Sequence, residues 1–282
     1  MRRHQFEVYL DKVFEFSRQV ADLPEGRQYP RHAWKKVFDA VFLGTACQFA
    51  ALHRIETECR QGAFSKRIGR LSEDAIGYAL QRQKPEPVFT LGCAVARQLK
   101  RNGVLRSNWA RGRVVVAADG IEICNSFVRS CDTWLQRGVT HKVAGELRED
   151  IQYYHRFCTA VVVSAAFPIP LGIRFQQPGE TEVACSLALV RDLVAHLGLR
   201  FFGVLVADAL YLQTPFVQAI EALGLDWVIN LKENQPELLA EAERLTGGEP
   251  TRQDSDSHQQ LQLWHAPEVY WPEAERSVRV VK

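Results

Sequence analysis

Two aspartates follow apolar runs that are typical of buried strands. Asp119 follows residues 114–118 (VVVAA), and Asp208 follows residues 201–207 (FFGVLVA). A carboxylate beside buried apolar surface is costly unless it is paired, hydrogen-bonded or bound to a cation, so each needs a partner. Oxygen ligands suit Mg²⁺ or Mn²⁺, and a pair of such ions can promote phosphodiester chemistry. A shared divalent-metal site is one hypothesis; the other is that each aspartate only caps a strand or begins a turn, as Asp119-Gly120 pairs often do.

The surrounding elements decide whether the two aspartates can meet. Short β-rich runs occupy residues 114–118, 153–166, 169–175, 201–207 and 227–231, and helical patterns at 183–197 and 214–223 precede the last two. This order predicts an α/β fold, in which an antiparallel meander and added parallel strands form a mixed sheet covered by helices. The first and fourth strands can then be neighbours, which would bring Asp119 and Asp208 together.

The first part of the chain is helical in pattern and basic in charge. Residues 1–113 hold 21 Lys and Arg against 11 Asp and Glu, whereas residues 114–282 hold 14 against 22. We therefore predict a basic helical region at 1–112 that fits DNA as its large anion, followed by a domain at 113–282 that is rich in carboxylates. Arg67 and Arg70 are candidate contacts to a DNA backbone. The alternative for each is a solvated basic surface.

Three further cations are candidate DNA contacts in the second part. Arg137 and Lys142 are predicted to lie in a polar loop between the first strands. Lys232 directly follows the last strand, at the carboxyl edge where the aspartates are expected, and it could bind a phosphate. The alternative for Lys232 is a flanking position for the helix that begins at Pro236.

Three segments carry a resemblance to a known family. VVVAADGIEICNS, QYYHRFCTAVVVSAAFPIPLGIRFQQPGETE and VLVADALYLQTPFVQAIEALGLDWVINLKENQPELL resemble the IS4-like group of DDE transposases, over roughly residues 110–246. The resemblance implies a ribonuclease-H-like catalytic domain in which Asp119 and Asp208 are the first two acidic metal ligands. It further implies Mg²⁺ as cofactor, with Mn²⁺ as a substitute, for cleavage and strand transfer at the ends of an insertion sequence. The expected partners are transposon ends and target DNA, and a homodimer is compatible with them.

The third acidic residue of that family is not found. Its signature is Tyr-x2-Arg-x3-Glu-x6-Lys on a helix, but Tyr153-x2-Arg156 is followed by Ala160 at the glutamate position, and Tyr270 is followed by Glu273 at the arginine position. We therefore expect a chain that is incomplete at its C-terminus, with DNA transposition activity reduced or lost. Two alternatives stay open: a catalytically dead DNA-binding remnant, and an unrelated metal-dependent nuclease.

Other classes of protein are disfavoured by composition and motif content. The longest apolar stretch, 157–173, contains Pro168 and Pro170 and is too short to span a bilayer, and the N-terminus lacks an apolar signal-peptide core, so a cytoplasmic protein is expected. Seven scattered cysteines without a CxxC pair predict reduced, buried thiols. No nucleotide-binding, zinc-protease or serine-hydrolase motif is present.

Overall fold

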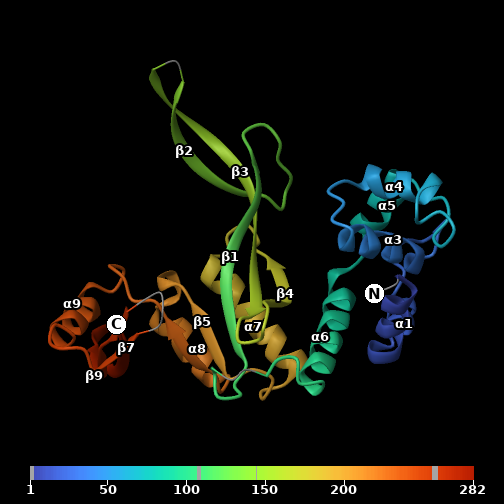
Figure 1. Ribbon diagram of the computed structural model, residues 1–282. Coiled ribbons are helices and arrows are strands. Elements are labelled where there is room, and N and C mark those ends of the chain that lie inside the picture. Colours follow the sequence, from blue (N-terminus) through green and yellow to red (C-terminus); the bar gives the residue numbers. More distant parts are fainter. Residues whose placement is uncertain (1–2, 107–108, 144, 256–259) are drawn as a thin grey trace. The chain divides into compact units, whose positions relative to one another are not determined.

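The computed structural model describes residues 3–106, 109–143, 145–255 and 260–282. The chain divides into two compact units, residues 1–102 and 103–282, and each is described by itself (Figure 1).

The first unit is built from helices. The periodic pattern at its start forms two helices rather than one, because the backbone turns at Glu15, which has a φ of 50°. Ser72 is a true N-cap, since its hydroxyl accepts a hydrogen bond from the Ala75 N–H at 3.3 Å. The six helices are α1 (Arg3–Phe14), α2 (Phe16–Ala21), α3 (Trp34–Ala46), α4 (Leu52–Gln61), α5 (Glu73–Arg82) and α6 (Pro85–Arg101).

A six-stranded mixed sheet organises the second unit. The strand β3 is central to its antiparallel part, because β1 pairs along its C-terminal half, β4 pairs on the other side and β2 pairs with its N-terminal half. The strands β5 and β6 then continue the sheet beyond β1 in parallel. The six strands are β1 (Val115–Ser126), β2 (Leu135–Val143), β3 (Glu146–Val162), β4 (Ile169–Phe175), β5 (Val204–Ala207) and β6 (Asp226–Ile229).

Two helices cover the sheet. The helix α7 (Glu182–Leu197) packs against β1, β3 and β4, and α8 (Thr214–Ala222) packs against β6 and α7. Both connect strands by crossovers, as the sequence pattern predicted. The fold class is therefore confirmed: it is α/β, a ribonuclease-H-like mixed sheet flanked by helices and preceded by a mainly helical N-terminal region.

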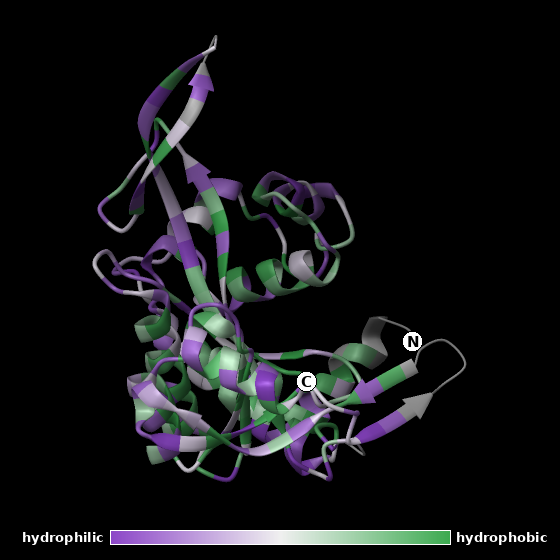
Figure 2. Cartoon of the chain, turned by 90° about the vertical axis from the view of Figure 1, so that its left-hand side faces the viewer, coloured by the Kyte–Doolittle hydropathy of each residue, from purple (hydrophilic) through white to green (hydrophobic). Residues whose placement is uncertain are grey.

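A long arm extends from the sheet and differs from the sequence prediction. The strands β2 and the first half of β3 pair from Leu135–Tyr154 to Val143–Glu146, and Figure 1 shows them projecting away from the helices that cover the sheet. Hydrophilic residues recur along this arm in Figure 2. The expected polar loop is therefore wrong, because these residues form a two-stranded ribbon that lacks one consistently buried face.

The C-terminal segment forms a small second core beside β6. The fully buried Trp271 lies there with Leu238 and Val269. The predicted helix after residue 235 is present, and both predicted terminal strands occur. The elements are α9 (Pro236–Leu245), β7 (Arg252–Ser255), β8 (Gln260–Leu263), β9 (His265–Trp271) and β10 (Arg276–Val281), with short 3₁₀ turns η1 (Ala209–Tyr211) and η2 (Pro272–Ala274).

An ion pair joins this segment to α8 and predicts an acid-sensitive contact. Glu221 accepts hydrogen bonds from both terminal nitrogens of Arg276, at 2.7 and 2.8 Å, and from the Trp227 indole at 2.8 Å. The Arg276 guanidinium, with a smaller contribution from the indole, holds the pKa of Glu221 below its ordinary value. Because the folded-state pKa is the lower one, this contact stabilises the fold above the unfolded pKa of about 4.3, and its contribution is lost as pH falls through the folded-state pKa.

We expect the variant Glu221→Gln to lose less stability than the parent protein on acidification from about pH 5 to pH 3. Thermal unfolding at a series of pH values measures the difference between the two proteins. If the stability of both proteins changed with pH in the same way, the Glu221–Arg276 ion pair would not be the source of the acid sensitivity.

The seven cysteines all lie within the described residues. All seven cysteines are free, and four are buried, but Cys47, Cys124 and Cys131 are exposed, so the prediction of uniform burial is wrong for these three. None of the helices in the described ranges combines the length and the apolar character that a membrane crossing requires.

Candidate metal centre at the carboxyl end of β5

The strand register places Asp119 beside Asp208. The strands β1 and β5 run parallel, and the last residue pair of their register is Ala117 with Val206. Asp119 and Asp208 each lie two residues further along their strand direction, and neighbouring strands lie about 4.8 Å apart. The sheet therefore brings together the two carboxylates that are separated by 89 positions in the sequence.

Both aspartates face away from α7. Along β1, Gly120 and the buried Ala118 lie on the side of α7, and a Cβ built on Gly120 would meet the carboxyl group of Glu182 from that helix. Side chains alternate along a strand, so Asp119 points to the opposite face. Asp208 keeps an extended backbone, with φ −81° and ψ 179°, and follows the buried Ala207, so it shares that opposite face.

Each carboxylate is exposed and is held by a local backbone hydrogen bond. The Gly120 N–H donates to Oδ1 of Asp119 at 2.8 Å, and the Leu210 N–H donates to Oδ1 of Asp208 at 2.8 Å. Each aspartate therefore has a hydrogen-bond partner, as expected, but both are exposed, so burial alone does not require a cation at either position. Asp208 does cap a short turn, η1, as the simpler hypothesis proposed, but Asp119-Gly120 is no turn, because β1 continues through it and pairs with Thr159 and Cys158 of β3.

The donor set fits Mg²⁺ or Mn²⁺. Mg²⁺ is usually held by one or two carboxylates and keeps several waters or substrate oxygens. Asp119 and Asp208 supply two exposed carboxylates on one face, and a backbone N–H engages only Oδ1 of each, so Oδ2 can turn toward an ion. The same face also carries the exposed apolar side chains of Ile121, which is 43% exposed, and Val228, which is 58% exposed.

A polar loop borders the same edge of the sheet. Asn230 directly follows β6 and lies opposite Asp208 if the β5–β6 register is continued by one residue. Asn234 donates to the Ala209 carbonyl at 2.7 Å, and Gln235 donates to the Leu212 carbonyl at 3.0 Å, so this loop supports the turn that follows Asp208. Lys232 is exposed in the loop, and its contact with a phosphate stays a prediction.

The two candidate cations of the arm differ in their surroundings. Arg137 lies on β2, where its guanidinium forms a two-pronged ion pair with Glu122, at 2.8 and 3.0 Å, and also donates to Gln152 at 2.7 Å. Lys142 is exposed near the end of β2. A DNA contact by Arg137 would have to replace these partners, whereas one by Lys142 would displace no partner among the described residues.

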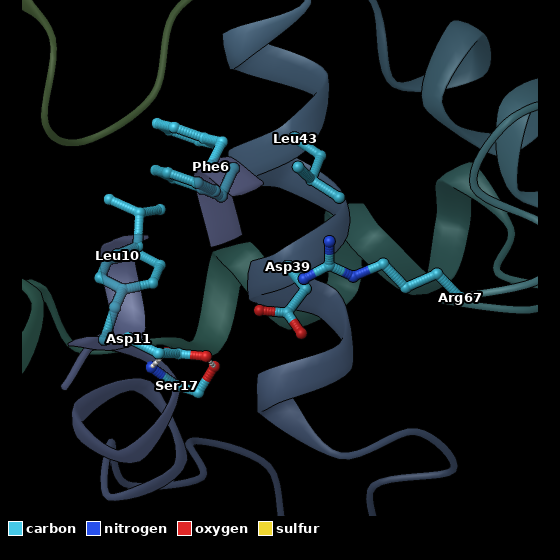
Figure 3. A pocket seen from close by; sticks show the side chains of 9 residues that line it. Phe6, Leu10, Asp11, Ser17, Asp39, Leu43 and Arg67 are labelled. Carbon is cyan, nitrogen blue, oxygen red and sulfur yellow. Dashed lines mark hydrogen bonds between the residues drawn. The ribbon is translucent and has the colours of Figure 1, made fainter. Parts of the chain in front are cut away.

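Arg67 and Arg70 lie in the first unit, in the segment between α4 and α5. Figure 3 shows the Arg67 side chain extending toward Asp39, whose carboxylate binds Lys35 at 2.7 Å. Arg70 is exposed, and its carbonyl accepts from Lys36 at 3.0 Å. Both arginines are exposed at the surface of the helical unit, and DNA contact by either stays a prediction.

A third carboxylate does not join the pair within the described residues. There, groups of three or more metal-ligating side chains occur only as His53, Glu56 and Glu73, whose ligand atoms lie within 4.8 Å of one another in the first unit. Glu56 already binds Arg60 at 3.2 Å and the Glu73 N–H at 3.0 Å, so that group joins α4 to α5 without an ion.

Sequence reasoning missed Glu182, the first residue of α7. Its carboxylate approaches Gly120 on the side of the sheet opposite to Asp119, so it is not a third ligand in this arrangement. A glutamate in the first turn of a helix is ordinary, because it complements the helix dipole. The available signal was the glycine next to Asp119, since a glycine inside a strand often marks the close approach of another group.

The chain was also compared with known proteins. No protein-family model and no curated protein matches this chain. Among solved structures, a chain of the piggyBac transposase synaptic complex with hairpin DNA aligns with 98% of this chain and 60% of its own length, at 11% identity and a TM-score of 0.39. A chain of the pre-cleavage Mos1 transpososome aligns over 77% of this chain and 64% of its own, at 13% identity and a TM-score of 0.25.

A third alignment is with the simian T-cell lymphotropic virus intasome in complex with PP2A regulatory subunit B56 gamma. It covers 53% of this chain and 51% of that chain, at 13% identity and a TM-score of 0.22. This chain thus spans 51–64% of the length of the structures it matches. The strand order and the register of the sheet define the fold.

Proposed function

We propose that this chain is a transposase of the IS4-like DDE group, which binds the ends of an insertion sequence and uses Mg²⁺ to cut and transfer DNA strands. Asp119 and Asp208 are its metal ligands and catalytic residues. A bound ion at this site supplies a Lewis acid that activates water or a 3′ hydroxyl and stabilises the leaving oxygen. The basic helical region, residues 1–112, is the DNA-binding part.

The observation that supports this proposal best is the pairing of the aspartates. Their strands are parallel neighbours, both carboxylates are exposed on the face without α7, and each is oriented by one backbone N–H. Two carboxylates that only cap strands would not need to share a face and an edge of one sheet. Two carboxylates must share a face and an edge in this way if they are to bind one divalent ion between neighbouring strands.

We expect purified protein with Mn²⁺ to convert supercoiled plasmid into nicked circles, and chelation of the metal to stop the reaction. Agarose electrophoresis of a time course measures the conversion. Plasmid that stays supercoiled, while the protein binds it, would exclude an active nuclease centre in this chain.

The second candidate is a DNA-binding remnant without catalysis, which the missing third carboxylate favours. Within the described residues the aspartate pair gains no further acidic ligand. This candidate predicts salt-sensitive DNA binding with no cleavage, because contacts to phosphates release counterions. A gel-shift series at rising salt, run beside the nicking assay, separates the two candidates.

A further inference from the structure

A buried polar network lies directly behind the aspartate pair. Glu182 is half-buried, with 13% of its side chain exposed, and its Oε2 accepts a hydrogen bond from Nη1 of Arg156 at 2.9 Å. Its Oε1 accepts from the hydroxyl of Tyr211 at 3.1 Å. That hydroxyl also lies 2.9 Å from Oγ of Ser186, and both Tyr211 and Ser186 are fully buried.

The main chain of β1 makes room for this carboxylate. A Cβ built on Gly120 would lie 2.4 Å from Cδ of Glu182 and 2.6 and 2.7 Å from its two oxygens. Real Cβ atoms do not approach so closely, so only glycine allows Glu182 to lie against the strand here. The carboxylate therefore packs on the backbone of the residue next to Asp119.

The same carboxylate reaches the segment that follows Asp208. Tyr211 is the last residue of η1, the turn that Asp208 caps through the Leu210 N–H. Burial and the neighbouring Glu182 raise the pKa of Tyr211, so its hydroxyl stays protonated and can donate. One side chain thus contacts Gly120 after Asp119 and Tyr211 after Asp208, while Arg156 of β3 and the start of α7 hold it in place.

We propose that Glu182 is a positioning residue, which fixes the spacing of Asp119 and Asp208 from behind the sheet. This inference rests on the proposed function of the aspartate pair for its consequence, but the structural effect can be measured without metal or DNA. The two oxygens of this carboxylate bind different segments of the chain, so the carboxylate fixes the positions of those segments relative to each other. Loss of Glu182 should therefore loosen both aspartate segments together.

The first measurement is amide exchange in the metal-free protein. In Glu182→Ala we expect the Gly120 and Leu210 amides, which donate to the two aspartates, to shift in nitrogen–proton NMR spectra and to exchange at least about tenfold faster. Glu182→Gln should restore most of the protection, because its Oε1 can still accept from Arg156 and its amide can donate to the Tyr211 oxygen. Tyr211→Phe, which keeps the ring, should affect Leu210 more than Gly120.

Glu180→Ala is the matched control. Glu180 also pairs with an arginine, Arg174 at 3.4 Å, and lies two residues before Glu182, but its hydrogen bonds go to Arg174, Gln176 and Gln177 and not to either aspartate segment. The Glu180→Ala variant also removes one negative charge, and it should leave the Gly120 and Leu210 amides unchanged. Unchanged amides in Glu182→Ala, or equal changes in Glu180→Ala, would overturn the positioning role.

The second measurement is Mn²⁺ binding by calorimetry. We expect Glu182→Ala to weaken binding about tenfold, the lower end of the range for supporting residues around metal ligands, with Glu182→Gln between it and the parent protein. Binding that is equal in the parent and in Asp119→Asn would reject the metal centre while leaving the amide result to decide on Glu182. Binding lost in Asp119→Asn but unchanged in Glu182→Ala would reject the positioning role alone.

Discussion

Asparagine at either position 119 or 208 is expected to reduce Mn²⁺-dependent plasmid nicking by more than about a hundredfold. The amide oxygen of asparagine can still accept the hydrogen bond that Gly120 or Leu210 now donates to each aspartate. Local structure is therefore kept, and the charge that binds the ion is removed. The double variant should be no worse than either single variant, because two ligands of one metal centre act as a unit.

Asp192→Asn is the control for this pair of variants. Asp192 is exposed on α7, so the substitution removes one negative charge without touching the aspartate edge. We expect it to nick plasmid at the parental rate, and we expect the two site variants to bind Mn²⁺ at least tenfold more weakly. Nicking by the Asp119 and Asp208 variants at the parental rate would remove the metal centre from this chain.

The aspartate pair was predictable because burial leaves a strong pattern in sequence. The runs that precede Asp119 and Asp208 are apolar on both faces, which indicates central strands, and the alternating helices imply crossovers that place the first and fourth strands together. The prediction used the order of elements, and the parallel register of β1 and β5 confirms that the two strands are neighbours. The bound metal and the DNA contacts stay predictions.

The arm escaped prediction for the opposite physical reason. Most of the paired residues of β2 and of the first half of β3 are exposed, including Leu147, which is 71% exposed, and Ile151, which is 53% exposed. A strand that buries neither face has no constant alternation of polar and apolar residues, so local pattern cannot reveal it. The same effect hid the continuation of β1 beyond Asp119.

The glycine after Asp119 signals that some group approaches the strand, but it does not identify Glu182, because the proposed role of Glu182 depends on three partners from distant segments. Arg156 lies 26 residues before it and Tyr211 lies 29 residues after it, and neither spacing is local. Only the fold shows that the glycine after Asp119 and the tyrosine after Asp208 meet at one carboxylate. Sequence patterns report burial and local turns, whereas a polar network of this kind is set by tertiary packing.

The second large effect is expected from Trp271→Ala in the C-terminal core. Trp271 is fully buried, its ring meets Trp227 edge-on at 6.4 Å, and its indole N–H donates to Oε1 of Gln235 at 3.0 Å. Removing a buried tryptophan side chain lowers the free energy of unfolding by about 3–5 kcal/mol, and Oε1 of Gln235, left without its hydrogen-bond donor, adds to the loss. The midpoint of urea unfolding, followed by far-ultraviolet circular dichroism, measures the change.

Tyr270→Ala is the matched control, since Tyr270 is the adjacent residue of β9 and is 54% exposed on the other face of that strand. Its replacement should cost less than about 1 kcal/mol. Equal losses in the two variants would mean that Trp271 is not the centre of this core.

Because Gln235 also donates to the Leu212 carbonyl just beyond η1, we further expect Trp271→Ala to speed amide exchange at Leu210 even where the protein is folded. The C-terminal core would then support the turn after Asp208, while Glu182 supports both aspartate segments from the α7 face.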